Sequence, residues 1–365
     1  MSTPVDFAAV FRGKRVLVTG HTGFKGAWLA IWLEGLGAKV TGVGLAPHTE
    51  PSLFELARLA KRMEDCRCDI RDRDALERIV ARIRPEFVFH LAAQALVRVS
   101  YASPIDTMAT NVLGTAHLLE SLRTHAPQAV VVVVTSDKCY ENREWVWPYR
   151  ENDPLGGHDP YSASKACAEI VAASWRRSYG GEGGSRIATA RAGNVIGGGD
   201  WSPDRIVPDC VRALSRGETI SVRNPAAIRP WQHVLEPLSG YLLLAARLHE
   251  SPRFAEAWNF GPDDQDTRTV EDLVKTVVAS WGEGARWALA KQVGEPHEAN
   301  ALTLSSIKAR RELGWHPTWH LDRAIGATIA WYKDCLGGGD AYLLCKDAIE
   351  GFTATDQVAN PSPLL

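Results

Sequence analysis

The chain has 365 residues, of which 45% are hydrophobic, and a formal net charge of -2. Because single hydrophobic cores stop growing beyond about 250–300 residues, we expect two lobes. The charge excludes a general nucleic-acid binder, since binding along a phosphate backbone requires a basic excess.

The seven cysteines are scattered and include no Cys-x-x-Cys pair, which indicates free thiols in a reducing compartment. The start of the chain lacks the basic and apolar regions of a secretory signal. No apolar run approaches the ~18 residues of a membrane span. We therefore expect a cytoplasmic protein without a membrane partner.

The first predicted strand, at residues 15–20, leads into the turn Gly20-His21-Thr22-Gly23-Phe24-Lys25-Gly26, and a helix is predicted at 27–36. Glycines at this spacing permit a tight turn and close backbone approach. The helix N-terminus offers amides and a positive dipole to a pyrophosphate. A turn of this kind between a strand and a helix predicts a dinucleotide site.

The second predicted strand, at 39–45, lacks the acid expected about 20 residues past the glycines, where the ribose 2′-OH of NAD is held. Leu45-Ala46-Pro47-His48 stands there instead. Lys25 and His21 in the turn could tolerate a 2′-phosphate. These residues alone leave the choice between NAD and NADP open.

Cys68-Asp69-Ile70-Arg71-Asp72 is predicted to end a third strand, where Asp69 could meet the adenine edge of a cofactor. Asp72, and in part Asp69, could instead cap the helix predicted at 74–84.

A fourth strand at 87–91 leads into Ala92-Ala93-Gln94, whose small residues would let the backbone approach the cofactor. A long helix is predicted at 106–123, followed by a strand of five valines at 130–134. This alternation predicts an α/β fold with a doubly wound, Rossmann-like parallel sheet.

The valine strand runs into Thr135-Ser136-Asp137-Lys138 and should be buried on both faces, so its end should open on a ligand crevice. Tyr161 and Lys165 stand one turn apart on a helix predicted at 161–179. The ammonium can therefore lie beside the phenol and lower its pKa, which makes a general base. A surface pair at this spacing is the alternative, and the polar segment upstream favours catalysis.

Beyond residue 185 the predicted elements shorten, which fits a smaller C-terminal substrate-binding lobe. Arginines and His233 occur there among tryptophans and suit a nucleotide diphosphate, although any one arginine could be an ordinary surface residue. His316 and His320 are separated by Pro317, which breaks the helix that a zinc pair would need, so no metal site is predicted.

We expect a dinucleotide-binding domain at 1–190 with part of 230–260 returning to it. A mainly nucleotide-sugar-binding lobe at 191–335 and a C-terminal extension at 336–365 with a mobile end complete the chain.

These motifs, in this order, resemble the extended short-chain dehydrogenase/reductases and, within them, the nucleotide-sugar 4,6-dehydratases. The resemblance covers residues 13–332 and rests on the glycine turn, His90-Leu91-Ala92-Ala93, Asn111-Val112-Leu113-Gly114-Thr115, the Tyr161/Lys165 pair, Arg191-x-x-Asn194 and Leu313-Gly314-Trp315-x-Pro317. The segments at 135–140, 191–201 and 229–234 are most similar to the branch of the family that acts on CDP-glucose. Relatives that act on dTDP- or GDP-sugars usually carry Asp-Glu in place of Asp137-Lys138.

The resemblance implies that Tyr161 takes the O4 proton of glucose, that Lys165 steadies the phenolate and that Ser136 bonds O4. Asp137 would be the acid at O6 and Lys138 the base at C5. Lys138 could equally stay charged and stabilise the enolate.

The resemblance also implies NAD as the cofactor, with NADP not excluded, and a homodimer or dimer of dimers that pairs the helices at 106–123 and 161–179. The implied cofactor residues are Gly20, His21, Gly23, Phe24, Lys25, Gly26, Asp69, Ile70, Leu91, Ala92, Ala93, Asn111, Tyr161 and Lys165. The implied substrate residues are Gln94, Asn194, Arg205, Arg229 and His233. The arginine that the family carries before Leu313 is absent, and His297, Glu298 and Asn300 stand there.

A nucleotide-sugar 4-epimerase is the main alternative, since it shares the fold and the Tyr161/Lys165 pair. Epimerases usually lack an acid followed by Lys or Glu at 137 and 138, where two groups are needed only for loss of water. A plain alcohol dehydrogenase and a redox-sensing binding protein are further alternatives.

Overall fold

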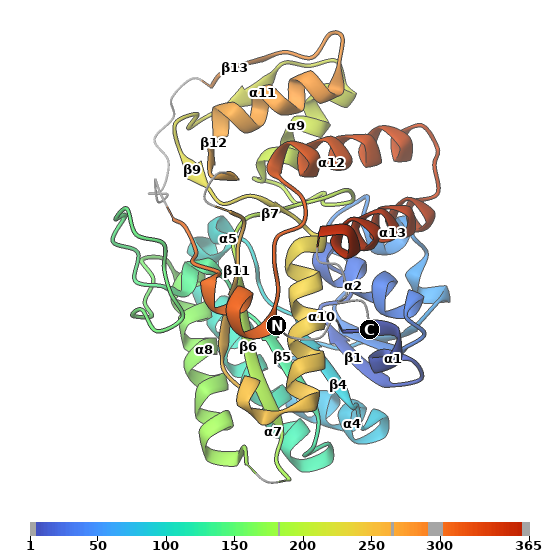
Figure 1. The fold of residues 1–365 in the computed structure, drawn as a ribbon, viewed down its shortest axis with the longest axis vertical. Coiled ribbons are helices and arrows are strands. Elements are labelled where there is room, and N and C mark those ends of the chain that lie inside the picture. The colour runs from blue at the N-terminus through green and yellow to red at the C-terminus, as the bar shows by residue number, and fades with distance from the viewer. Residues whose placement is uncertain (1–4, 182, 264–265, 291–301, 360–365) are drawn as a thin grey trace.

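A seven-stranded parallel sheet forms the centre of the larger lobe (Figure 1). The computed structural model describes residues 5–181, 183–263, 266–290 and 302–359. Across the sheet the order is β11-β6-β5-β4-β1-β2-β3. The strands are β1 (Arg15–Thr19), β2 (Lys39–Gly44), β3 (Glu64–Arg67), β4 (Phe87–His90), β5 (Val130–Val134), β6 (Arg186–Ala192) and β11 (Ala257–Phe260). The doubly wound sheet predicted from the sequence is confirmed.

The strand order reverses between β1 and β4, because the chain moves outward from β1 to β3 and then returns to the other side of β1. Ligands of such sheets bind beyond the carboxyl ends of the strands at this switch point. The crevice is therefore expected beyond Thr19 and His90, which end these two strands.

The valine strand shows why the sheet needs a layer of helices on both sides. Val130, Val132 and Val134 belong to one hydrophobic cluster, and Val131 and Val133 belong to the other. Successive side chains of a strand point to opposite faces, so both faces of β5 are buried. The helices that pack on the sheet or lie beside it are α1 (Phe7–Phe11), α2 (Phe24–Gly35), α3 (Leu53–Leu56), α4 (Arg73–Ile83), α5 (Val97–Ala102), α6 (Pro104–Met108), α7 (Gly114–His125), α8 (Pro160–Tyr179) and α10 (Leu235–Glu250).

The helix predicted at 106–123 is interrupted. A π-helical segment, Ala109–Leu113, separates α6 from α7. Such segments are frequent at functional sites, and this one carries Asn111. The third strand also ends earlier than predicted, at Arg67, so residues 68–72 form the connection to α4.

The smaller lobe contains α9, α11 and α12 together with three two-stranded sheets, which pair β7 with β10, β8 with β13 and β9 with β12 (Figure 1). The bounds are α9 (Ile206–Ser215), α11 (Val270–Trp281), α12 (Leu321–Leu336), β7 (Val195–Ile196), β8 (Ile220–Val222), β9 (Ile228–Arg229), β10 (Gln232–His233), β12 (Arg268–Thr269) and β13 (Trp287–Leu289). Between these elements, α10 and β11 return to the large sheet. The domain limits at 190 and 335 stay a prediction.

The last helix, α13 (Ala341–Ala359), packs on both α2 and α12. The Phe352 ring meets Trp32 of α2 edge-on at 6.0 Å and Trp319 at 5.3 Å. Aromatic pairs in this geometry add to ordinary apolar burial. The extension thus braces the helix that follows the glycine turn against the smaller lobe. Of the helices in the described part of the chain, none has the length and hydropathy needed to cross a bilayer.

Candidate active site

The glycine turn is shaped by close backbone contacts that leave no room for a Cβ atom. Gly20 has φ +74°, and a Cβ there would lie 2.7 Å from the Ala92 amide nitrogen. A Cβ on Gly26 would collide with the Gly20 carbonyl. Helix α2 begins after Gly23, and within the described ranges no side chain caps its first amides. The turn therefore fits a dinucleotide pyrophosphate at the helix N-terminus.

The His21 side chain lies against β2 and β3, at one edge of the sheet. Its buried ring lies against Gly42, and its Nε2 lies 2.8 Å from Asp65 Oδ1 on β3. Burial lowers the pKa of His21 more than the Asp65 carboxylate raises it. Asp65 also pairs with Arg67 at 2.8 Å. Sequence reasoning missed Asp65, because its contact with His21 spans two strand connections.

Asn111 connects the loop after β4 to α8, the helix that carries Tyr161 and Lys165. Its Oδ1 accepts a hydrogen bond from the Gln94 amide at 2.8 Å, and its Nδ2 donates to Ser164 Oγ at 2.8 Å. The Gln94 side chain bonds within its own segment: its Nε2 donates to the Leu96 carbonyl and to Thr107 Oγ1, each at 3.0 Å. The structure thus brings Leu91, Ala92, Ala93 and Gln94 beside the glycine turn and α8.

The acids after β3 divide into the two roles that the sequence left open. Asp72 caps α4 by accepting a hydrogen bond from the Ala75 amide at 3.0 Å. Asp69 accepts from the backbone amide of Arg71 at 2.9 Å and pairs with its guanidinium at 2.7 Å. The neighbouring Ile70 is buried against Gly114, where no Cβ would fit without displacing it.

The end of β5 carries the densest group of polar side chains. Ser136 Oγ donates to Asp137 Oδ1 at 3.0 Å and accepts from the Lys138 amide at 3.2 Å, at the start of a short 3-10 turn, Asp137–Cys139. Asp137 is only 1% exposed, and its Oδ2 has no hydrogen-bond partner among the described residues. Lys138 Nζ lies 3.3 Å from Asp137 Oδ1 and 3.5 Å from Asn194 Oδ1. An acid and an amine therefore lie side by side at the crevice.

Tyr161 stands beside this turn on α8. Burial raises its pKa, whereas the Lys138 charge and a hydrogen bond with Ser136 lower it. The Lys165 ammonium instead donates to the Val134 carbonyl at 3.3 Å, and burial lowers its own pKa to about 8. Among the charges that lower the Tyr161 pKa, that of Lys138 has the largest effect. The action of Lys165 on the phenol stays a prediction.

Lys25 from the glycine turn reaches the same space. Burial, together with the charges of Arg205, Lys165 and Lys138, lowers its pKa to about 7, although Asp137 acts to raise it. Four cations from four parts of the chain, Lys25, Lys138, Lys165 and Arg205, thus lie around this space. Such a group of cations suits anionic ligands such as diphosphates.

Arg205 is held in place by an acid that sequence reasoning missed. Its guanidinium lies 3.0 Å from Asp200 Oδ2, and the buried Asp200 also accepts a hydrogen bond from the Ser202 amide at 3.0 Å. Arg229 lies buried on β9 and donates to the Ile228 carbonyl at 2.9 Å. Asn194 lies beside Lys138. His297, Glu298 and Asn300 lie outside the described residues.

His233 has core contacts. Its ring packs against Trp28 at 6.0 Å and Trp319 at 4.8 Å, and its Nδ1 accepts from the Leu235 amide at 3.3 Å. These contacts do not support the predicted substrate role. Within the described residues, no group of three metal-ligating side chains could hold a metal ion.

The comparisons with known proteins agree with this geometry. The family model described as GDP-mannose 4,6-dehydratase matches residues 17–328. A CDP-glucose 4,6-dehydratase of Salmonella typhimurium is 51% identical over 348 residues, which are 94% of this chain and 97% of the relative.

The chain belongs to the GDP-mannose 4,6-dehydratase family.

Two solved structures of this family's fold are similar over most of the chain. The dTDP-glucose 4,6-dehydratase of Streptomyces venezuelae, solved with NAD bound, has a TM-score of 0.72 and 26% identity and covers 90% of this chain and 99% of its own. An epimerase of Methanothermobacter thermautotrophicus has a TM-score of 0.77 at 23% identity, covers 93% and 96%, and shares the fold. The family resemblance predicted from the sequence is confirmed.

His233 should make this 4,6-dehydratase family member sensitive to acid. Burial lowers the pKa of His233 from 6.5 to about 3, so between these values the unfolded chain binds a proton that the folded chain does not. Stability is therefore lost as the pH falls below 6.5, by about 2 kcal/mol at about pH 5.

A His233→Phe variant keeps the packing and cannot be protonated. We expect its unfolding free energy, measured by denaturant titration, to fall by about 2 kcal/mol less than that of the wild type between about pH 7 and 5. His158→Gln, at an exposed position, is the control and should behave as the wild type. If His233→Phe lost as much unfolding free energy as the wild type between these pH values and also showed a large rise in substrate KM, the substrate role of His233 would be restored.

Proposed function

We propose that the chain converts CDP-glucose to CDP-4-keto-6-deoxyglucose, a hydro-lyase reaction of deoxysugar and polysaccharide biosynthesis. The observation that carries this proposal is the turn at the end of β5, where Asp137 and Lys138 stand beside Tyr161. The 51% identity to a CDP-glucose 4,6-dehydratase supports the choice of sugar nucleotide.

NAD is the proposed cofactor, and the S. venezuelae relative was solved with NAD bound. The glycine turn would hold the pyrophosphate on the amides at the start of α2, and Lys165 would hold the nicotinamide ribose. When bound, NAD would supply a hydride acceptor for C4 and a donor for C6. A 2′-phosphate of NADP would need space and positive charge near this edge of the sheet. His21 and Asp65 occupy that edge, and Asp65 brings a carboxylate to it. This supports NAD over NADP.

The first proton transfer falls to Tyr161, which takes the proton from O4 as C4 is oxidised. A phenol needs help to lose a proton near neutral pH. Burial raises the Tyr161 pKa overall, and the Lys138 charge and the Ser136 hydrogen bond oppose that rise. Ser136 also stands where it can bond O4.

Loss of water then needs a base at C5 and an acid at O6. A ketone at C4 acidifies H5, and Lys138 is the proposed base. Asp137 is the proposed acid, and its buried Oδ2, which lacks a partner in the described part of the chain, is the oxygen placed to carry the proton. One turn of chain therefore supplies both groups.

Substrate binding is proposed to use Asn194, Arg205 and Arg229, with Asp200 holding the Arg205 guanidinium toward the crevice. Gln94 is not included in this set because its side chain bonds within its own loop, and His233 is not included because its ring packs in the core. All seven cysteines are free thiols in the structure, which supports a cytoplasmic location.

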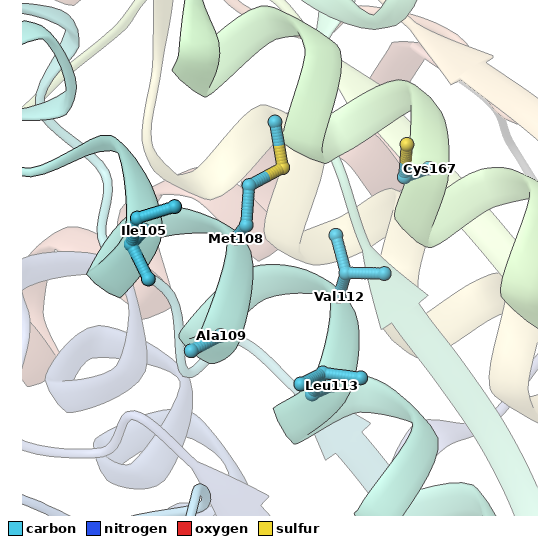
Figure 2. A pocket seen from close by; sticks show the side chains of 6 residues that line it. All are labelled: Ile105, Met108, Ala109, Val112, Leu113 and Cys167. Atoms are coloured by element: carbon cyan, nitrogen blue, oxygen red, sulfur yellow. The ribbon is translucent and has the colours of Figure 1, made fainter.

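The proposal includes a homodimer. An apolar pocket is lined by Ile105, Met108, Ala109, Val112, Leu113 and Cys167, of which only Cys167 comes from α8 and the rest from α6 and the π-helical segment (Figure 2). Ile105 is 78% and Leu113 56% exposed, and Ile170 on α8 is 57% exposed. An apolar patch of this kind favours association. Leu119, an apolar residue of the helix predicted at 106–123, lies in the core and is not part of this patch.

The substrate is tested by incubating the enzyme and NAD with CDP-, dTDP-, GDP- and UDP-hexoses and weighing the products by mass spectrometry. We expect loss of one water from CDP-glucose alone. Unchanged mass with a C4 epimer would support the epimerase, and reduced cofactor equal to product would indicate a plain dehydrogenase. Tight NAD binding without any turnover would point to a redox-sensing protein.

The dimer is tested by sedimentation of the wild type and of Leu113→Asp, with Leu289→Asp as a control at another exposed apolar position. A charge in the paired face should split the dimer, whereas the control should sediment as the wild type. A wild type that sediments as one chain at micromolar concentration would end the proposal.

A further inference from the structure

A buried ion pair lies directly behind the catalytic turn. Glu169 Oε2 and the Arg191 guanidinium are 2.8 Å apart, and each side chain is 3% exposed. Glu169 follows Lys165 by one turn of α8, and Lys165 follows Tyr161 by one turn. The three side chains therefore lie along one face of the helix.

Glu169 holds the near end of the turn. Its Oε1 accepts a hydrogen bond from the hydroxyl of Thr135, the residue immediately before Ser136. Its Oε2 also accepts from Thr189 Oγ1 on β6 at 2.7 Å. Both carboxylate oxygens are thus used, one of them on the catalytic segment.

Arg191 holds the far end. Its guanidinium donates to the Tyr140 hydroxyl at 2.7 Å and to the Glu151 carbonyl at 3.0 Å, and it lies 4.9 Å from the centre of the Tyr140 ring. Tyr140 directly follows Cys139, the last residue of the turn, and itself donates to Asn259 Oδ1 at 2.8 Å. One ion pair therefore reaches both flanks of residues 136–139.

Stability alone does not account for such a pair. Removing two charges from water costs several kcal/mol per ion, and apolar replacements of buried pairs are often neutral or stabilising. What the pair adds is geometry, because its hydrogen bonds fix the turn relative to α8, which carries Tyr161.

We propose that Glu169 and Arg191 are positioning residues: they clamp both ends of the 136–139 turn against α8 and keep Lys165 charged. This inference rests on the proposed function and adds to it the residues that align its acid, its base and its phenol.

The effect on Lys165 follows from its surroundings. Burial lowers its pKa to about 8, and the Glu169 charge opposes that shift. Glu169 itself stays ionised, because the Arg191 charge and its hydrogen bonds outweigh burial and hold its pKa below the usual value.

The other titratable groups near Lys165 come from three further elements. Burial lowers the pKa of His90 to about 3 and raises that of Cys139 far above its usual value, so both are neutral between pH 6 and 9. Among the described residues whose charges interact with that of Lys165, Lys25, with a pKa lowered to about 7, also titrates in this range.

The test uses Glu169→Gln and the double variant Glu169→Gln/Arg191→Met, which leaves no unpaired buried charge and should fold if the single variant does not. Thr189→Val is the control, since it removes a neutral partner of Glu169 and keeps the ion pair. Hydrogen exchange of the amides of residues 136–140 is measured by mass spectrometry. The pH profile of C4 oxidation is followed by the absorbance of reduced nicotinamide in a single turnover.

We expect the double variant to exchange these amides about tenfold faster and to lose C4 oxidation at a pH about one unit lower than the wild type. Thr189→Val should change neither. A double variant with wild-type exchange and a wild-type alkaline limb would overturn the inference. If wild-type enzyme fails to oxidise CDP-glucose, the proposed function fails, and the exchange measurement still decides whether the pair holds the turn.

Discussion

The parallel pairing of β1, β4, β5 and β6 is the constraint on which the site depends. Strands that run in one direction deliver all their carboxyl ends to one edge of the sheet. The glycine turn, the loop at Ala92, the turn at Ser136 and the segment that ends in Asn194 follow these four strands and meet there. Residues separated by more than 100 positions in the sequence thereby reach hydrogen-bond distance. Tyr140, which follows the turn, bonds Asn259 at 2.8 Å, and Trp28 bonds the Gly198 carbonyl at 2.9 Å between the lobes.

Charge is distributed unevenly across this edge. Lys25 lies among the charges of Arg205, Lys165, Lys138 and Asp137, while Asp200 pairs with Arg205 and Glu169 acts on Lys165. Burial makes positive charge costly at this edge and, helped at Lys25 by the cationic neighbours, lowers the pKa of Lys25 and Lys165. Two diphosphates, one from the cofactor and one from the substrate, are ligands that would balance it. The same depressed pKa values are what amines need in order to exchange protons near neutral pH.

Local pattern predicted much of this arrangement. The glycine turn, the buried valine strand and the Tyr161/Lys165 spacing are properties of short segments, and the sheet that they predicted is the one observed. Contacts between distant segments were out of reach. Spacing along α8 predicted Lys165 near Tyr161, but it could not show that Lys165 bonds the Val134 carbonyl or that the Lys138 charge also acts on the phenol. The sequence predicted His233 as a substrate ligand, since it does not show that the rings of Trp28 and Trp319 pack around this residue in the folded chain. Asp65, Asp200 and Glu169 have no signature in the sequence, since their importance comes from what folds against them.

The central claim is that one turn, at Asp137 and Lys138, carries the loss of water while Tyr161 carries the oxidation. Its most direct test is a single turnover of CDP-glucose in deuterated water that follows reduced nicotinamide and deuterium at C5 together, in Lys138→Ala, Asp137→Asn and Tyr161→Phe. Because Lys138 also lowers the Tyr161 pKa, Lys138→Ala should need a higher pH to oxidise C4, and at that pH it should accumulate reduced cofactor while exchanging H5 far more slowly than the wild type. In Asp137→Asn the substrate should exchange H5 but keep its O6 hydroxyl, and Tyr161→Phe should neither reduce the cofactor nor exchange H5. Exchange of H5 at the wild-type rate in Lys138→Ala would contradict the account.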